Sequence, residues 1–215
     1  MIGNSHDRLG VPLIALCLFW LIGVVAGSAV LNNYVSTSGY QGKAVKKWLV
    51  SDSLALASPL STLIMVVHPQ CSCSQASITE LAIIMARCHN KVKGYVLFVS
   101  PSNLPISWTK SNLWYRVKEM PGVSPIIDLN GSLAHQLNAE TSGQTFVYDA
   151  HGDLSFSGGI TSGRAHEGDN AGVDRVIACI NGGATNSSST AVFGCSLFSC
   201  SQVAPELQTS KANKQ

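Results

Sequence analysis

Two cysteines separated by one residue, Cys71 and Cys73, are the side chains of this sequence best suited to chemistry. They lie in the segment 68–74, which reads HPQCSCS. Two sulfurs at this spacing can exchange electrons as a dithiol and a disulfide, or chelate a soft metal ion. The segment therefore predicts either a redox centre or a thiolate metal site.

The residues on either side of this segment are expected to form a buried strand and a helix. Residues 61–67 (STLIMVV) are a short apolar run rich in β-branched side chains. From Gln75 to His89, apolar side chains recur at helical spacing. These are Ile78, Leu81, Ala82, Met85 and Cys88. A helix amino terminus carries unpaired N–H groups and roughly half a positive charge, so it favours a thiolate over a thiol.

This arrangement assigns different roles to the two sulfurs. Cys71 is nearer the strand end, so we expect it to be the more exposed sulfur and the nucleophile. Cys73, one turn into the helix, is expected to resolve the mixed disulfide. His68 is either a strand-end residue or a metal ligand.

The remaining cysteines divide into buried and undecided ones. Cys88 lies on the apolar face of the predicted helix, so we expect a small buried hydrophobe there, and the same for Cys179 in a later helix. Cys17 falls within an apolar span. Cys195 and Cys200 either pair with each other, reach back to the Cys71–Cys73 site or stay free, because sequence alone does not give the Cα separation that a disulfide needs.

Composition excludes some classes of protein. The chain has 215 residues, of which 46% are hydrophobic and only 12% charged, so a sizeable core can form. Its net charge of +2 and lack of a basic stripe argue against a nucleic-acid partner. It has no GxGxxG motif, phosphate loop or Ser/His/Asp set that would indicate another enzyme class.

An uncharged apolar segment runs from Val11 to Leu31. About 20 such residues span a bilayer, whereas the apolar region of a signal peptide usually has about 7–15, so we expect a membrane anchor, with a cleaved signal peptide as the alternative. Lys43, Lys46 and Lys47 would by charge place the following chain in the cytoplasm. They lie well past the segment, and an amino-terminal segment before a cysteine-containing domain more often exports it. We therefore expect a single-pass protein with its domain on the extracytoplasmic side.

The rest of the chain alternates between strand and helix patterns. Strands are expected at 94–99, 123–128, 145–148 and 154–157, and helices at 108–120, 132–139 and 170–181. The two strands at 145–157 flank a Gly-containing turn and form a hairpin. This order predicts an α/β fold in which a mixed sheet with parallel strands is flanked by helices.

The same patterns divide the chain into five parts. They are an N-terminal tail (1–10), the transmembrane anchor or signal peptide (11–31), a linker (32–44), a domain (45–183), and a Ser/Asn-rich linker with the Cys195 segment and a polar tail (184–215).

A cysteine pair at the end of the first core strand, in this order of elements, resembles the thioredoxin-like superfamily, and more closely its membrane-anchored RedB-type proteins. The motifs that carry the resemblance are 68–74, TSGQ at 141–144, SGGIT at 157–161 with HEGDNAG at 166–172, and VFGC at 192–195. The resemblance implies a thioredoxin-like fold and thiol–disulfide chemistry.

The sequence departs from ordinary thioredoxins in two places. Thioredoxins have two residues between their cysteines, whereas here Ser72 alone stands between them, and a disulfide closed over one residue is strained and more oxidising. Thioredoxins also place a cis-proline before the hairpin, where the backbone contacts the substrate peptide. Here Ser142, Gly143 and Gln144 occupy that place.

In the thioredoxin topology, the loop after Ile160 returns to the cysteine end of the sheet. It carries a polar cluster consisting of Arg164, His166, Glu167, Asp169 and Asn170. Asp169 or Asn170 is expected to cap the last helix. His166 and Glu167 are not favoured caps, so we interpret them as a pair that transfers protons or assists a metal, since imidazole titrates near neutrality.

Three functions are consistent with these residues. The first is thiol–disulfide exchange with a protein or small-molecule partner, catalysed by Cys71, Cys73, His166 and Glu167 and requiring no cofactor. The second is Cu(I) binding or delivery by Cys71 and Cys73 with His68, His166 or Cys195, because Cu(I) selects thiolates. The third is a structural or sensory disulfide. Zinc is disfavoured because no fourth ligand stands at a usual spacing.

Overall fold

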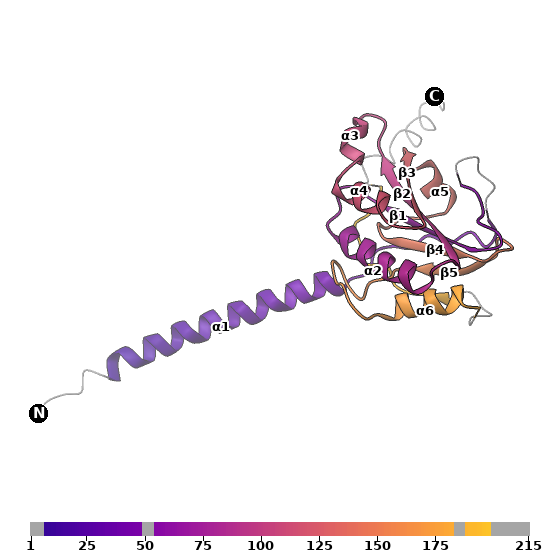
Figure 1. Cartoon of the computed structure of the whole chain (residues 1–215). Coiled ribbons are helices and arrows are strands. Elements are labelled where there is room, and N and C mark those ends of the chain that lie inside the picture. Colours follow the sequence, from indigo (N-terminus) through magenta and orange to yellow (C-terminus); the bar gives the residue numbers. More distant parts are fainter. Residues whose placement is uncertain (1–6, 49–53, 183–187, 199–215) are drawn as a thin grey trace, which may run out of the picture. The chain divides into compact units, whose positions relative to one another are not determined.

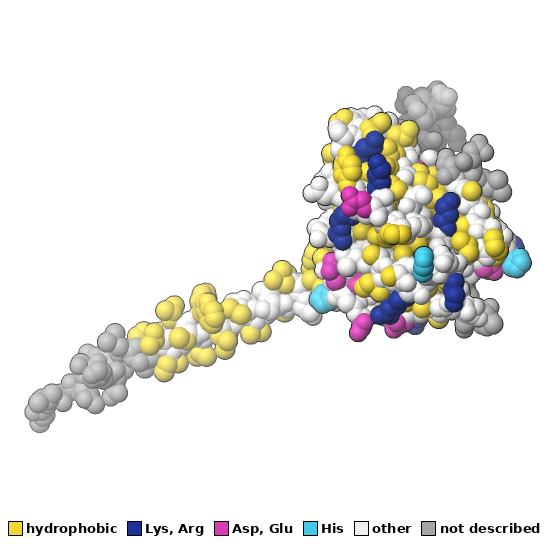
Figure 2. Space-filling view, in the orientation of Figure 1, with side chains coloured by type: hydrophobic (Ala, Val, Ile, Leu, Met, Phe, Trp, Pro, Cys, Tyr) yellow, Lys and Arg dark blue, Asp and Glu magenta, His cyan; other side chains and the backbone are white. Residues whose placement is uncertain are grey.

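The computed structural model describes residues 7–48, 54–182 and 188–198, in two units that meet between Thr37 and Ser38. The first unit contains helix α1 (Asp7–Ser36). Its stretch Pro12–Ser36 has a mean hydropathy of 2.5, and hydrophobic side chains cover much of its visible surface (Figure 2). The helix extends beyond the predicted 11–31, and its length and composition suit a membrane anchor or a signal sequence.

The second unit is built on a six-stranded sheet with the strand order β3-β2-β1-β4-β5-β6 (Figure 1). In chain order its elements are β1 (Ser61–Val67), α2 (Cys73–Arg87), β2 (Val92–Ser100), α3 (Ile106–Thr109), α4 (Asn112–Lys118), β3 (Val123–Leu129), α5 (Ser132–Gln136), β4 (Gln144–Tyr148), β5 (Leu154–Gly158), α6 (Ala171–Ile180) and β6 (Ser188–Ser189). Strands β1, β2 and β3 run parallel, whereas β4 is antiparallel to both β1 and β5. The predicted mixed sheet and hairpin are therefore confirmed.

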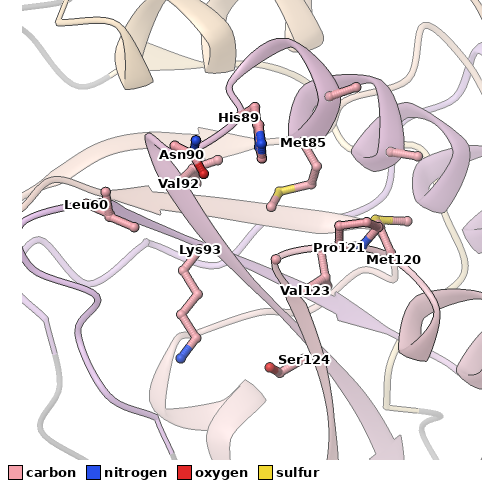
Figure 3. A pocket seen from close by; sticks show the side chains of 13 residues that line it. Leu60, Met85, His89, Asn90, Val92, Lys93, Met120, Pro121, Val123 and Ser124 are labelled. Carbon is pink, nitrogen blue, oxygen red and sulfur yellow. The ribbon is translucent and has the colours of Figure 1, made fainter.

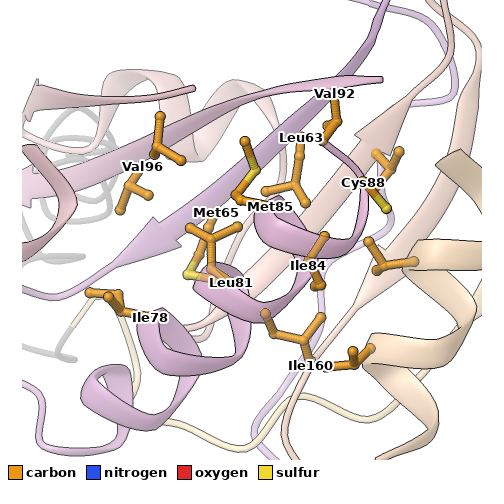
Figure 4. Packing of buried hydrophobic residues seen from close by; sticks show 14 of the residues in the cluster. Leu63, Met65, Ile78, Leu81, Ile84, Met85, Cys88, Val92, Val96 and Ile160 are labelled. Carbon is orange, nitrogen blue, oxygen red and sulfur yellow. The ribbon is translucent and has the colours of Figure 1, made fainter. Parts of the chain in front are cut away.

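Alternate residues of β1 support two separate cores because successive side chains of a strand point to opposite faces. Leu63 and Met65 pack in a cluster with residues of α2, α4 and α6 (Figure 4). Ile64 and Val66 pack on the opposite face with residues of α5 and with Leu197. Because both faces are covered, β1 is buried, and its carboxyl end is held in a fixed position.

The predicted helix at 108–120 is wrong as a single element. The chain forms α3, turns at Lys110 and Ser111, and starts α4 at Asn112. Thr109 is fully buried, and its hydroxyl is 2.6 Å from that of Ser100 at the end of β2. The extended backbone of Ser111 then forms the N-cap position of α4.

The predicted domain boundaries at 45 and 183 exclude residues that the structure packs into the domain. The Gly39 amide donates to the Val192 carbonyl, and the Gln41 side chain donates to the Thr190 carbonyl. Val192 and Leu197 are buried, and β6 pairs with β5. Small polar residues made both segments look like linkers, but hydrogen bonds join the two segments to each other, and β6 joins the second one to the sheet. The part of the predicted region 184–215 that follows residue 198, which includes Cys200, lies outside the described residues.

Candidate functional site

Cys71 and Cys73 lie where β1 ends and α2 begins. Cys73 is the first residue of α2, and Cys71 precedes it in a turn whose amide donates to the His68 carbonyl. The Ser74 amide in turn donates to the Cys71 carbonyl. The prediction that Cys71 is the more exposed of the two is wrong, since Cys71 is 4% and Cys73 5% exposed. Exposure therefore does not distinguish the two sulfurs.

A third cysteine completes the cluster. The Sγ atom of Cys195 lies 3.0 Å from that of Cys71, and the sulfurs of Cys71, Cys73 and Cys195 all lie within 4.8 Å of one another. Of the alternatives that the sequence leaves open for Cys195, the structure selects the one in which it reaches back to the Cys71–Cys73 site. Among the described residues, the group of side chains close enough to share a metal ion here consists of these three cysteines and includes neither His68 nor His166.

Backbone hydrogen bonds hold Cys195 in place. The Ser142 amide donates to the Cys195 carbonyl at 2.8 Å, and Thr141 forms an antiparallel bridge with Ser196. A Cβ at Gly194 would overlap the Ser142 carbonyl oxygen, so only glycine permits this close approach. The segment that carries Cys195 is therefore joined by one antiparallel bridge to the loop that enters β4.

Ser142 also links the cysteine turn to this loop. Its hydroxyl accepts a hydrogen bond from the His68 amide and lies 2.7 Å from the Ser74 hydroxyl, and the next residue, Gly143, donates its amide to Val66 in β1. The residues that replace the thioredoxin proline thus fix the end of β1, the start of α2 and the Cys195 segment relative to one another.

Hydrogen bonds stabilise the thiolate of Cys71. Burial raises the pKa of the Cys71 thiol. Hydrogen bonds from Cys195 and from Ser74 lower it, and together they outweigh burial, so the pKa of Cys71 lies below its ordinary value. Both donor residues offer a side chain and a backbone group. Cys71 is therefore the sulfur of the cluster most readily ionised.

The other two sulfurs favour the protonated form. Burial raises the pKa of Cys73, and the negative charge of Cys71 raises it further. Burial, the hydrogen bond to Cys71 and the charge of Cys71 raise the pKa of Cys195 to about 12. The positive charge of Arg164 opposes both shifts. The cluster thus combines one favoured thiolate with two thiols.

The loop after β5 brings Arg164 to the cluster, as the predicted topology requires. Its guanidinium donates to the carbonyl of Gly194, the neighbour of Cys195. Farther along the same loop, the Gly168 amide donates to the carboxylate of Glu80, a residue of α2 that is 1% exposed. This buried contact ties the loop to α2.

The histidine and carboxylate predicted for this loop lie on its outer side. His166 and Glu167 are exposed, and Glu167 accepts a hydrogen bond from Thr79 of α2. Their role in proton transfer stays a prediction. Asn170 caps α6 by accepting from the Val173 amide, as predicted.

His68 is a half-buried strand-end residue. Its ring packs edge-on against Trp108, its Nδ1 accepts from the Gln70 amide, and burial lowers its pKa. These contacts hold the ring against Trp108 and use one of its nitrogens.

Two residues contribute to the site in roles that the sequence patterns did not predict. Ser74, which follows Cys73 directly, lowers the pKa of Cys71 through a hydrogen bond. Arg164, in the loop after β5, lowers the pKa of Cys73 through its charge. A serine directly after a CxC pair and an arginine in that loop are the signals that would have identified them.

One described pocket of the domain lies away from the cysteines. A pocket of about 760 Å³ is lined by Leu60, Met85, Lys93, Val123 and their neighbours (Figure 3). Leu60 precedes β1, whereas the cysteines follow it, so the pocket lies at the opposite end of the parallel strands. It takes no part in the cysteine site.

No protein-family model matches the chain, and no curated protein matches it. Among solved structures, it is similar to a hypothetical protein of Sinorhizobium meliloti, with 18% identity and a TM-score of 0.53 over 76% of this chain and 96% of that one. An uncharacterized conserved protein of Geobacillus kaustophilus gives 15% identity and a TM-score of 0.52 over 75% and 92%. A secreted disulfide oxidoreductase of Mycobacterium tuberculosis has 11% sequence identity and a TM-score of 0.40, over 57% of this chain and 81% of that one.

The fold is thioredoxin-like. Its central β1 is flanked by parallel β2 and antiparallel β4, and α2 starts directly after the β1 strand end. The cysteines lie at this junction, where the sequence predicted them. The protein is thus a thioredoxin-like domain with a three-cysteine cluster, preceded by one apolar helix.

Proposed function

We propose that this protein is a membrane-anchored thiol–disulfide oxidoreductase of the RedB type, with its domain on the extracytoplasmic side and Cys71 as the nucleophile. The observation that carries the proposal is a buried cysteine at a helix start whose pKa is lowered by hydrogen bonds while two further thiols lie within 4.8 Å. A thiolate is the reactive form in disulfide exchange, and a second thiol is needed to release the product.

The chemistry has two steps. The Cys71 thiolate attacks one sulfur of a substrate disulfide, forms a mixed disulfide and releases the other sulfur as a thiolate. A second thiol of the cluster, Cys73 in the prediction from sequence, then attacks the Cys71 sulfur and releases the rest of the substrate. Two protein thiols become a disulfide, and one substrate disulfide becomes two thiols.

The test is reduction of glutathione disulfide by the reduced full-length protein in detergent. Cys71→Ser is expected to abolish the reaction. Cys179→Ser is the matched control, because the Cys179 sulfur lies in α6 against the Ser155 carbonyl, outside the cluster. Full activity in Cys71→Ser, or none in the wild type, contradicts the proposal.

Cu(I) binding is a second candidate, favoured by the proximity of three sulfurs. Thiolates select Cu(I), and Cys71, Cys73 and Cys195 supply three without a change of fold. The reduced protein would then hold one Cu(I) per chain against a competing chelator, and each Cys→Ser change in the cluster would weaken it. Tight stoichiometric copper without disulfide turnover would replace the first proposal by this one.

A further inference from the structure

The segment that carries Cys195 delivers a thiol to Cys71 from outside the cysteine motif. Residues 194–197 are joined to residues 140–142 by the Ser142 amide on the Cys195 carbonyl, the Thr141–Ser196 bridge and the Leu197 amide on the Glu140 carbonyl. This is the geometry in which an extended segment adds a strand through main-chain hydrogen bonds. The position of Cys195 is thus set by the backbone and not by a flexible side chain.

We propose that Cys195, rather than Cys73, is the thiol that resolves the mixed disulfide on Cys71, so that the oxidised protein carries a Cys71–Cys195 disulfide. The inference rests on the proposed oxidoreductase function. It assigns the second redox residue to a position 124 residues away from the first in sequence.

Distance favours Cys195. Its Sγ is 3.0 Å from that of Cys71, so an approach of about 1 Å brings the two sulfurs to bonding distance. Both backbones are anchored on either side of that contact, Cys71 by the turn before α2 and Cys195 by Ser142. The disulfide closes between elements that the fold already holds together.

Local geometry disfavours Cys73. Ser72 has helical backbone angles (φ −61°, ψ −32°), and the Ser74 and Gln75 amides donate to the carbonyls of Cys71 and Ser72. A disulfide between Cys71 and Cys73 closes a small ring over Ser72 and must distort this first turn. Cys73 therefore requires a change of backbone that Cys195 does not.

The electron and proton balance is complete with these groups. After Cys71 has attacked the substrate disulfide, the released substrate thiolate takes the proton of Cys195. The Cys195 thiolate then attacks the Cys71 sulfur, forms the Cys71–Cys195 bond and breaks the bond between Cys71 and the remaining substrate sulfur, which leaves as a thiolate and is protonated from solvent. A dithiol reductant returns the protein to its starting state.

The experiment is disulfide mapping of the full-length protein after reaction with glutathione disulfide. The reaction is stopped with acid, free thiols are alkylated, and the chain is digested with trypsin and chymotrypsin. Cleavage after Phe193 and Phe198 separates Cys195 from Cys179 and Cys200. We expect a peptide containing Cys71 cross-linked to the peptide containing Cys195.

Serine variants identify the resolving thiol independently. In Cys73→Ser the Cys71–Cys195 link is expected to form as in the wild type, whereas Cys195→Ser is expected to accumulate a mixed disulfide of glutathione with Cys71. Cys179→Ser is the matched control. Circular dichroism shows whether each variant is folded. The disulfide map of the wild-type protein tests the inference even if a variant fails to fold.

Two results overturn the inference alone. One is a Cys71–Cys73 link with free Cys195 in the wild type, and the other is resolution by Cys195→Ser at the wild-type rate. In both, Cys71 still reacts, so the proposed oxidoreductase function survives. If Cys71 forms no mixed disulfide in the wild type or any variant, the proposed function and the inference both fail.

Discussion

At the scale of the residue, the difference between Cys71 and Cys73 arises from hydrogen bonds and not from exposure. Both are almost fully buried. Cys71 receives hydrogen bonds from Cys195 and Ser74 that lower its pKa, whereas burial and the charge of Cys71 raise the pKa of Cys73. Burial without donors would leave two inert thiols. The donors allow one of the two to ionise.

The first prediction concerns the donor at Cys195. Cys195→Ala removes a side-chain donor, so the pKa of Cys71 is expected to rise, and alkylation of Cys71 to begin at a higher pH. Cys195→Ser keeps a hydroxyl donor and is expected to retain the lowered pKa. The measurement is the rate of alkylation of Cys71 against pH, made in a Cys73→Ser background.

That comparison separates charge stabilisation from redox chemistry at the same position. Cys195→Ser loses the second thiol but not the hydrogen bond, whereas Cys195→Ala loses both. Identical pH profiles for the two variants would show that the side chain of Cys195 does not stabilise the Cys71 thiolate.

At the scale of the element, the start of α5 depends on a side chain that lies outside the helix. The carboxylate of Asp128, at the end of β3, accepts from the Leu133 and Ala134 amides at the start of α5. α5 is short, with five residues, so its own hydrogen bonds contribute little and this cap positions it. α5 in turn covers one face of the sheet.

The second prediction tests this cap. Asp128→Ala leaves two amides without their acceptor, and we expect a loss of about 2–3 kcal/mol in the free energy of unfolding. Asp169→Ala, at an exposed position, is the control and is expected to have little effect. Urea denaturation followed by circular dichroism measures both. Equal midpoints for the two variants would contradict the role of Asp128.

At the scale of the whole molecule, the segment after residue 188 completes the domain. Leu197 is 4% exposed and packs in the core with Leu133 and Phe146. Two residues earlier in the same segment, Cys195 contacts Cys71. Packing and the cysteine site therefore depend on the same short segment.

The third prediction follows from this packing. Leu197→Ala is expected to lower the free energy of unfolding by about 2–4 kcal/mol, since it removes a buried side chain. Leu129→Ala makes the same chemical change at a residue that is 57% exposed, and we expect a much smaller effect. Thermal or urea denaturation compares the two. If both lose the same stability, residue 197 does not contribute to the core.

The fourth prediction concerns helix α1. The full-length protein is expected to remain with membranes after alkaline extraction, and a chain that begins at Ser38 is expected to be released while keeping its melting temperature. An intact mass that lacks the apolar stretch would instead show a cleaved signal peptide, with Ala26-Gly27-Ser28 or Gly27-Ser28-Ala29 as the candidate site.

The sequence determined those features that depend on neighbours along the chain. The apolar run of β1 and the helical spacing after it placed Cys71 and Cys73 at a strand–helix junction. Asn170 was predictable as a cap because capping needs only a side chain and an amide three residues on. The hairpin was readable from alternation around a glycine turn.

Only the tertiary structure decided which distant residues meet. Cys195 reaches Cys71 because its segment pairs with Thr141 and Ser142, and a pairing between segments so far apart in the chain leaves no periodic signal in the sequence. The guanidinium of Arg164 likewise meets the Gly194 carbonyl, 30 residues farther along the chain. Such contacts depend on the packing of elements and on long-range backbone hydrogen bonds, whereas sequence patterns record only the local periodicity of burial.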